Sequence, residues 1–298
     1  MLDQLLTEQI NPGSLDIDVQ STLEMLRTMN REDKLVAPAV EAELPQIAQA
    51  VDLVVRTIEA GGRLFYIGAG TSGRLGVLDA AECPPTFSVS PDLVQGIIAG
   101  GEASLARATE ATEDDPAAGR NDLLARGFTA SDVLVGIAAS GRTPYVLGAV
   151  RQAHEMGAIT IGISCTPDSE LARAVNVAIT PLTGPEVIAG STRLKAGTAT
   201  KLVLNMISTA AMIRLGHVYG NLMVNVQPRN AKLQDRARRI VAAACGVSAE
   251  TAGALLARSG ASVKTAIVMG LLGLERPEAE QRLAGAGGRV SLVLPNLK

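Results

Sequence analysis

Two glycine-rich turns carry hydroxyl side chains in a pattern that suits anion binding. The first, Gly68-Ala-Gly-Thr-Ser-Gly-Arg74, directly follows an apolar run, and the second, Ser140-Gly-Arg-Thr-Pro144, follows another. Small residues let backbone N–H groups approach an anion, and Ser and Thr add hydroxyl donors. A helix that starts at the turn adds the positive end of its dipole. The pattern predicts a phosphate site made by Thr71, Ser72, Ser140 and Thr143.

Two other interpretations of these turns stay open at this point. Ser and Thr often cap helices, and Pro144 suits a first helical turn. The spacing Gly68-x-Gly70-x-x-Gly73 also loosely matches a dinucleotide fingerprint. That fingerprint needs an acidic residue about 20 positions later at the end of the next strand, and none is found there. A small phosphorylated molecule therefore fits better than a dinucleotide.

Cysteine and histidine are too sparse for several other chemistries. The three cysteines, Cys83, Cys165 and Cys245, are far apart and odd in number, so we expect reduced thiols. The two histidines, His154 and His217, form no HxxxH spacing that would bind a metal on one helix face. We expect neither a metal nor a Ser-His-Asp triad, so the chemistry must rest on carboxylates and hydroxyls.

Two glutamates are candidates for proton transfer. Glu82 precedes Pro84 and Pro85, which should end a helix near it, and the negative end of the helix dipole favours a protonated carboxyl that can donate. Glu113 is followed by two aspartates, which also disfavour its charged form. The alternatives are an ordinary carboxylate at a helix end and, for Glu113, a solvated acidic cap before Pro116.

Short β-branched apolar runs alternate with helical patterns through the middle of the chain. This rhythm predicts a doubly wound α/β fold, with a parallel sheet between helices and ligands outside the carboxyl ends of the strands. The expected strands are Leu64–Gly68, Val94–Ala99, Val133–Ala138, Ile159–Ser164 and Val175–Ile179, and the helices are 75–81, 104–111, 115–125, 145–156 and 170–174.

Helical patterns also flank this region. A stripe of apolar residues predicts a helix over 40–60, and an apolar-rich stretch predicts a buried helix over 191–215. We expect three parts: an N-terminal helical arm (1–50), an α/β domain that binds the phosphorylated ligand (51–220) and a small C-terminal helical module (221–298).

The composition narrows the class of protein. The 298 residues are 47% hydrophobic, with a net charge of −3, 2% aromatic residues and no Trp. A nucleic-acid binder would usually show a basic face or stacking aromatics, so we expect none bound. No apolar run is long enough to cross a bilayer, and the start of the chain does not read as a signal peptide. We expect a cytoplasmic protein without a membrane partner.

Longer strings around these residues resemble a known family. The sugar isomerase (SIS) fold has a Gly-Thr-Ser loop and a Ser-Gly-x-Thr loop, as here. More closely, the chain is similar to the N-acetylmuramic acid 6-phosphate etherase family, to which glucokinase regulatory protein is also similar. The matching strings are Ile67–Thr86, Gly136–Tyr145, Gly190–Lys201, Thr7–Pro12 and Asn205–Thr209.

The resemblance implies cleavage of the lactyl ether of N-acetylmuramic acid 6-phosphate by elimination and hydration, without a metal or organic cofactor. It matches Glu82 to the family's proton donor and Glu113 to its second acid/base. Gly141 and Ser191 match ligand-lining segments, although helix capping explains Ser191 almost as well. SIS relatives also imply a homodimer with a phosphosugar substrate.

Two alternatives share the same fold. A non-catalytic sensor of phosphosugars would use the same loops, but both glutamates are present here. An aldose–ketose isomerase would also move a proton at C2 of the sugar. Other SIS proteins often carry an extra Ser and a Glu in the second loop, where this chain has Ala138 and Arg142, which disfavours the isomerase.

Overall fold

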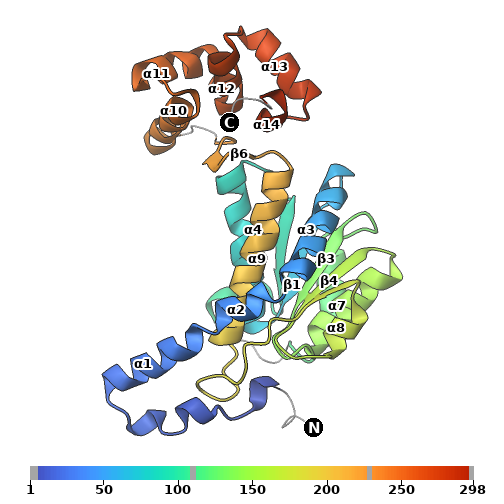
Figure 1. Ribbon diagram of the computed structural model, residues 1–298. Coiled ribbons are helices and arrows are strands. Elements are labelled where there is room, and N and C mark those ends of the chain that lie inside the picture. Colours follow the sequence, from blue (N-terminus) through green and yellow to red (C-terminus); the bar gives the residue numbers. More distant parts are fainter. Residues whose placement is uncertain (1–5, 108–111, 227–229, 295–298) are drawn as a thin grey trace. The chain divides into compact units, whose positions relative to one another are not determined.

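A computed structural model describes residues 6–107, 112–226 and 230–294 (Figure 1). The chain forms two compact units, one of Met1–Ala81 and Pro91–Ser208 and the other of Glu82–Ser90 and Thr209–Lys298. The division falls within two helices, α4 (Gly70–Phe87) and α9 (Lys195–Arg214). The three-part division expected from the sequence stays a prediction.

A five-stranded parallel sheet forms the centre of the first unit. Its strands lie in the order β2-β1-β3-β4-β5, with β1 hydrogen-bonded to both β2 and β3. The strands are almost entirely apolar and largely buried, as expected when helices cover both faces of a parallel sheet. The predicted α/β fold class is confirmed, and each predicted strand agrees to within two residues. The bounds are β1 Leu64–Gly68, β2 Val94–Ile98, β3 Val133–Ile137, β4 Ile159–Ile163 and β5 Val177–Ile179.

Helices pack on the sheet in separate layers. Strand residues such as Phe65, Ile67 and Leu134 share one apolar core with three helices, α6 (Pro116–Ala125), α7 (Pro144–Glu155) and α8 (Glu170–Ala174). Helix α3 (Leu44–Glu59) contacts β1, β3 and β5 without joining that core. The helix expected over 104–111 is represented by α5 (Ala103–Ala106), and residues 108–111 lie outside the described part of the chain.

The N-terminal segment consists of short helices. From residue 6 onward, where the described part of the chain begins, three 3₁₀ turns precede α1: η2 (Leu6–Glu8), η3 (Pro12–Ser14) and η4 (Ile17–Val19). Helix α1 (Thr22–Asp33) begins after its cap Ser21. The single helix expected over 40–60 is instead α2 (Val36–Glu41) followed by α3, because Pro45 lies at the start of α3, where a proline begins a helix rather than continuing one.

Helix α4 corrects one prediction from the sequence. Pro84 and Pro85 do not end it, because the helix continues to Phe87. A proline removes only its own N–H donor, and here the two prolines lie in the last turns. The helix then closes with a backbone hydrogen bond from Ser88 N to Pro84 O at 2.9 Å. Glu82 is therefore inside the helix, five residues before its end.

The second unit is mainly helical. An antiparallel pair, β6 (Val218–Tyr219) and β7 (Leu222–Met223), precedes the helices. Gly246 and Gly273 end α10 and α12 with φ of 65°, a left-handed conformation that favours glycine. The expected C-terminal helices are confirmed and share one apolar core. They are α10 (Ala231–Cys245), α11 (Ala249–Arg258), α12 (Val263–Leu272), α13 (Arg276–Gly285) and α14 (Val290–Val293).

Among the described residues, no single helix has both the length and the apolar content that a membrane span needs. Helices α10 and α11 reach both only as a pair, with a bend of 106° between them.

Candidate active site

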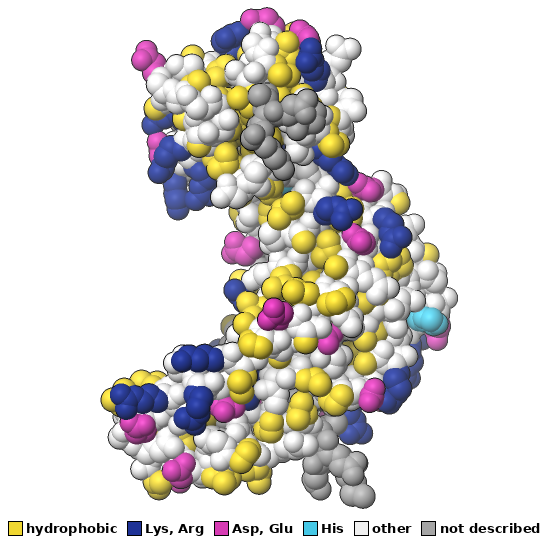
Figure 2. Space-filling view, viewed as in Figure 1, with side chains coloured by type: hydrophobic (Ala, Val, Ile, Leu, Met, Phe, Trp, Pro, Cys, Tyr) yellow, Lys and Arg dark blue, Asp and Glu magenta, His cyan; other side chains and the backbone are white. Residues whose placement is uncertain are grey.

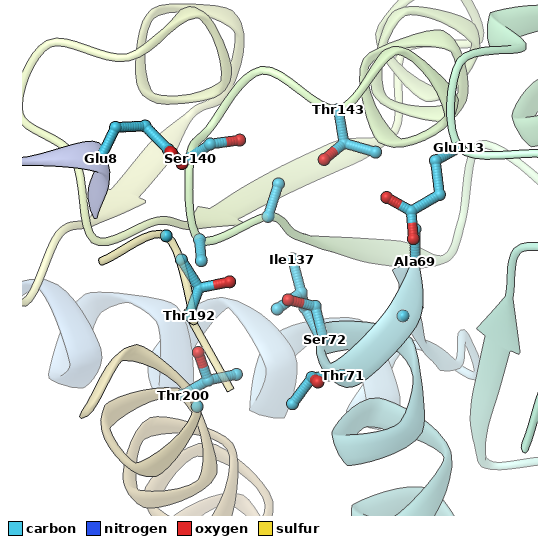
Figure 3. A pocket seen from close by; sticks show the side chains of 15 residues that line it. Glu8, Ala69, Thr71, Ser72, Glu113, Ile137, Ser140, Thr143, Thr192 and Thr200 are labelled. Atoms are coloured by element: carbon cyan, nitrogen blue, oxygen red, sulfur yellow. The ribbon is translucent and has the colours of Figure 1, made fainter. Parts of the chain in front are cut away.

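A polar pocket opens at the carboxyl ends of β1 and β3 (Figure 3). These two strands are neighbours in the sheet although they are not consecutive in the chain, so the loops that follow them leave in opposite directions. Such a switch point is where ligands bind in open α/β sheets. The described residues that line the pocket are Glu8, Ala69, Gly70, Thr71, Ser72, Glu113, Ile137, Ala138, Ala139, Ser140, Thr143, Gly190, Thr192, Gly197 and Thr200.

The first turn brings the start of α4 against the end of β1. A Cβ atom on Gly73 would lie 2.5 Å from the carbonyl oxygen of Gly68, so only glycine permits this approach. Gly70 has φ of 52°, which also favours glycine. The hydroxyls of Thr71 and Ser72 then enter the pocket from the first turn of the helix.

The second turn brings the start of α7 to the same pocket. Gly141 has φ of 66°, and a Cβ there would lie 2.3 Å from Ser169. Gly141 thus shapes the turn but does not line the pocket. Thr143 occupies the N-cap position of α7, yet its side chain makes no capping hydrogen bond, and Pro144 follows at the first helical position. Capping therefore does not use the Thr143 hydroxyl, which faces the pocket instead.

A third segment, before and within α9, closes another side of the pocket. It contributes Gly190, Thr192 and Thr200, whereas the predicted Ser191 is not among the lining residues. The helix begins at Lys195 rather than near Ser191.

The late start of α9 has a cause that the sequence pattern does not show. Glu186, a buried residue from the preceding loop, accepts hydrogen bonds from the N–H groups of Lys195 and Ala196 at 2.9 and 3.0 Å. This carboxylate therefore caps the helix from outside it. Burial raises the pKa of Glu186, while those two N–H groups and the Lys195 charge oppose the shift.

Glu113 is the only one of the two predicted acid/base residues that lines the pocket. It is half-buried, and its Oε1 lies 3.1 Å from where a Cβ on Gly70 would be. Its backbone carbonyl accepts a hydrogen bond from the N–H of Tyr145 in the first turn of α7 at 3.0 Å. The acidic cap of α6 is Asp115, which accepts from two backbone N–H groups. Glu113 is therefore held at the pocket, while Asp115 caps α6.

Glu82 does not line this pocket. Its side chain is exposed on α4, eleven residues after Thr71 in the chain. Its role as proton donor stays a prediction that rests on the family resemblance.

Glu8 lines the pocket although neither its residue type nor its spacing in the sequence predicts this. It lies in η2, far from the strand ends in sequence, and reaches the pocket because the N-terminal segment folds back onto the loop before α9. The Asn11 side chain donates to Pro185 O at 3.1 Å, and Ser14 Oγ donates to Val187 O at 2.8 Å. The matching string Thr7–Pro12 was the only sequence signal for this segment.

A buried ion pair strengthens the same attachment. Lys195 Nζ donates to Glu32 Oε2 at 2.8 Å, and Asn11 Nδ2 donates to the same oxygen at 2.7 Å. The Lys195 side chain is only 1% exposed. Burial alone would raise the pKa of Glu32, but the hydrogen bonds from Lys195 and Asn11 outweigh it and hold the pKa below its ordinary value.

The charges in the pocket are negative. Among the described residues that line it there is no Lys, Arg or His, and the charged groups are Glu8 and Glu113. An anion would be bound by hydroxyls, backbone N–H groups and the starts of α4 and α7. The cavity of about 210 Å³ suits a phosphate with part of a sugar better than a dinucleotide. Within the described part of the chain, no group of three or more His, Cys, Asp or Glu could hold a metal.

Two family models match the chain. The model for the glucokinase regulatory protein N-terminal SIS domain matches residues 46–154, and the SIS domain model matches residues 120–210. Both matched regions include parts of the pocket.

Whole-length relatives give the decisive comparison. A protein of Serratia proteamaculans named N-acetylmuramic acid 6-phosphate etherase is 55% identical over 98% of this chain and 99% of its own. This chain belongs to the N-acetylmuramic acid 6-phosphate etherase family. Etherases of Caldanaerobacter subterraneus and Salmonella typhimurium are each 52% identical, over 97% and 96% of the chain and 95% and 97% of their own lengths.

Solved structures agree with this family's fold at lower similarity. A putative phosphosugar isomerase from Bacteroides fragilis superposes with a TM-score of 0.51 at 21% identity, covering 67% of this chain and 95% of its own. A phosphoheptose isomerase from Neisseria gonorrhoeae also gives 0.51 at 21% identity, covering 64% and 98%. At this identity the likeness shows the SIS fold alone.

Proposed function

We propose that this protein is a carbon–oxygen lyase that cleaves the D-lactyl ether of N-acetylmuramic acid 6-phosphate. Water is consumed, and the products are N-acetylglucosamine 6-phosphate and D-lactate. The observation that carries the proposal is the full-length identity of 52–55% to proteins named as this etherase. The pocket supports the proposal, because its hydroxyls and two helix starts can bind a phosphate next to a carboxylate.

The chemistry follows from the open-chain form of the sugar. A free aldehyde at C1 acidifies the hydrogen at C2, so a carboxylate can remove it as a general base. The electron pair forms a C2–C3 double bond while the C3–O bond breaks, and the departing lactate oxygen takes a proton from a general acid. Water then adds at C3, and a proton returns to C2. A bound phosphate fixes where C2 and C3 of the sugar lie in the pocket, which lowers the entropy cost of the reaction.

Two residues are proposed for these proton transfers. Glu113 is assigned an acid/base role, supported by its position in the pocket beside Gly70. Glu82 is assigned as the proton donor on the family resemblance alone. Thr71, Ser72, Ser140 and Thr143 are proposed to bind the phosphate or sugar, with Gly141 and Ser191 as supporting positions in their loops.

The cellular setting is also part of the proposal. A lyase acting on this amino sugar serves carbohydrate metabolism, and we propose amino-sugar catabolism and peptidoglycan recycling in the cytoplasm. We also propose a homodimer. Figure 2 shows apolar side chains interspersed with charged ones on one face of the molecule. Several apolar side chains near the N-terminus are more than half exposed, namely Ile10, Leu15, Val19, Leu23, Leu26 and Leu35. Light scattering tests the dimer, and an active monomer would contradict it.

Release of D-lactate from N-acetylmuramic acid 6-phosphate is the direct test of the function. We expect the wild type to release it and deuterium from the solvent to enter at C2. A Glu113→Gln variant should lose about 10²- to 10⁴-fold in rate, the usual contribution of general acid–base catalysis. The matched control is Asp114→Asn, an exposed neighbour outside the pocket lining, which should keep its activity.

Two results would count against parts of this proposal. No lactate from the wild type would reject the etherase and would favour the sensor or the isomerase, which bind the same class of sugar. A Glu82→Ala variant with undiminished activity would leave the function intact and remove Glu82 as proton donor.

A further inference from the structure

The pocket holds two carboxylates, and only Glu113 has a part in the proposed chemistry. Glu8 enters from the N-terminal segment and lies on the other side of the pocket from Glu113 (Figure 3). Within the described part of the chain, the Glu8 carboxylate has no hydrogen bond or ion pair. We infer that Glu8 is a specificity-determining residue, whose carboxylate accepts hydrogen bonds from neutral O–H and N–H groups of the sugar and keeps anionic groups away from that side.

The position of Glu8 is fixed by its surroundings. Thr7 is buried, and a Cβ on Gly190 would lie 3.2 Å from Glu8 Oε2. The bonds from Asn11 to Pro185 O and from Ser14 to Val187 O fasten the same segment to the loop that contains Gly190. A segment that is held in place before binding loses little freedom when a ligand arrives. The backbone at Glu8 is therefore held at the pocket, and its exposed side chain reaches the pocket from there.

Charge decides which part of the ligand can face Glu8. An ionised carboxylate only accepts hydrogen bonds, so its partners must be O–H or N–H groups. It repels a phosphate, and the nearby α4 and α7 starts attract one. The phosphate therefore binds at those helix starts and the sugar extends past Glu113 toward Glu8. In the proposed substrate the lactyl carboxylate also turns away from Glu8, which leaves the hydroxyl and acetamido groups to contact it.

This assignment rests on the proposed function, because it uses the sugar of that reaction. Binding of two probes tests it: N-acetylglucosamine 6-phosphate, which has the sugar groups, and inorganic phosphate, which has none. We expect Glu8→Gln to bind N-acetylglucosamine 6-phosphate about tenfold more weakly, since a charge-assisted hydrogen bond becomes a neutral one. The same variant should bind inorganic phosphate about twofold more tightly, because a repulsive charge is gone.

Because the two expected changes in affinity have opposite signs, they distinguish recognition of the sugar by Glu8 from a loss of structure. If Glu8 only stabilised the fold, both ligands would bind more weakly, and that result would overturn the inference, as would unchanged binding of the sugar phosphate. The control is Glu24→Gln, an exposed carboxylate on α1 that pairs with Arg27, which should change neither affinity.

Lactate release is measured on the same proteins and keeps the two proposals apart. If Glu8→Gln weakens binding of the sugar phosphate and strengthens binding of inorganic phosphate, but the wild type releases no lactate, the role of Glu8 is supported and the etherase is rejected. If the wild type releases lactate and Glu8→Gln binds both probes unchanged, the etherase is supported and the role of Glu8 is rejected.

Discussion

Thr143 occupies a capping position but its hydroxyl is left for the pocket. Replacing it with Val keeps the shape and removes only the hydroxyl. If that hydroxyl binds the phosphate, Thr143→Val should weaken binding of N-acetylglucosamine 6-phosphate by roughly tenfold or more, the usual loss for a hydrogen bond to a charged group. Its free energy of unfolding should change by less than about 0.5 kcal/mol, because no cap is lost. Calorimetric titration and urea unfolding measure the two effects.

Ser248 provides the matched control for that stability measurement. It caps α11 by accepting a hydrogen bond from Thr251 N at 3.1 Å. Ser248→Ala should lower the free energy of unfolding by about 1 kcal/mol, the typical cost of a lost cap. Equal stability losses in the Ser248 and Thr143 variants would mean that the Thr143 hydroxyl is structural after all.

At this scale the sequence predicted the residues that follow strand ends and missed those that come from elsewhere. Ser140 and Thr143 could be found because a turn residue after an apolar run has a known place in a parallel sheet. Glu8 could not, because its position depends on the N-terminal segment folding back onto a distant loop, and the bond from Asn11 to Pro185 spans 174 residues. Residue types and spacing contain no such information.

Between elements, the contact of α6 with α7 depends on two glycines. A Cβ on Gly119 would lie 1.9 Å from Tyr145 O, and one on Gly148 would lie 2.0 Å from Pro116 O. Both distances are to backbone, which cannot rotate away. Gly148→Ala should therefore lower the free energy of unfolding by about 3 kcal/mol, the upper end for overpacking. Because Glu113 precedes α6, we also expect slower lactate release.

Gly253 in α11 is the control for the alanine substitution itself. The nearest atom to a Cβ there is Arg238 Cδ at 3.9 Å, so an alanine fits. Gly253→Ala should leave the free energy of unfolding unchanged or raise it by up to about 1 kcal/mol through helix propensity. A neutral Gly148→Ala would show that α6 and α7 can separate without cost.

A buried carboxylate connects α4 to α9 and should make stability depend on pH. Asp79 Oδ1 accepts from Asn205 Nδ2 at 2.8 Å and from Ser208 Oγ at 3.1 Å. Burial raises the pKa of Asp79 above its ordinary value of 3.8, and these hydrogen bonds offset only part of the shift. An acid with a raised pKa in the folded state contributes stability below 3.8 and loses it as the pH rises through the folded pKa.

The test compares urea midpoints of the wild type and Asp79→Asn from pH 8 down to pH 4. The wild type should gain stability relative to the variant as the pH falls, because only the wild type can take up that proton. A constant difference between the two midpoints would mean that Asp79 has the same pKa in the folded and unfolded chain.

Helix bounds were the less predictable part of the elements. The strands could be predicted because a buried parallel strand is a short apolar run between turns. The start of α9 depends on Glu186 and the end of α4 on the tolerance of Pro84 and Pro85 in a last turn, and neither follows from periodicity.

Across the first unit, the Lys195–Glu32 pair fastens the N-terminal segment to the start of α9. Removing one partner of a buried pair leaves an uncompensated charge, so Lys195→Met should lower the free energy of unfolding by about 3–5 kcal/mol. Adding Glu32→Leu should recover most of that loss, because two apolar groups need no partner. Urea unfolding of both variants measures this.

The exposed pair Arg27–Glu24 is the control for removing a cation. Its side chains are 62% and 54% exposed, so Arg27→Met should cost less than about 1 kcal/mol. If the double variant were no more stable than Lys195→Met, the loss would come from packing rather than from the unpaired carboxylate.

The overall architecture was the most predictable level, since five apolar runs separated by helices permit few topologies. The attachment of the N-terminal segment was not, because the exposed polar face of α1 and the buried Glu32 look alike in sequence.

The absence of cations among the described pocket residues also affects the speed of capture. Basic clefts attract anions from a distance, and added salt then slows their association. Here Glu8 and Glu113 lie at the pocket and the chain has a net charge of −3, so an approaching phosphosugar meets repulsion until it reaches the helix starts. Screening by salt should then accelerate association rather than slow it, which stopped-flow binding at rising ionic strength would detect.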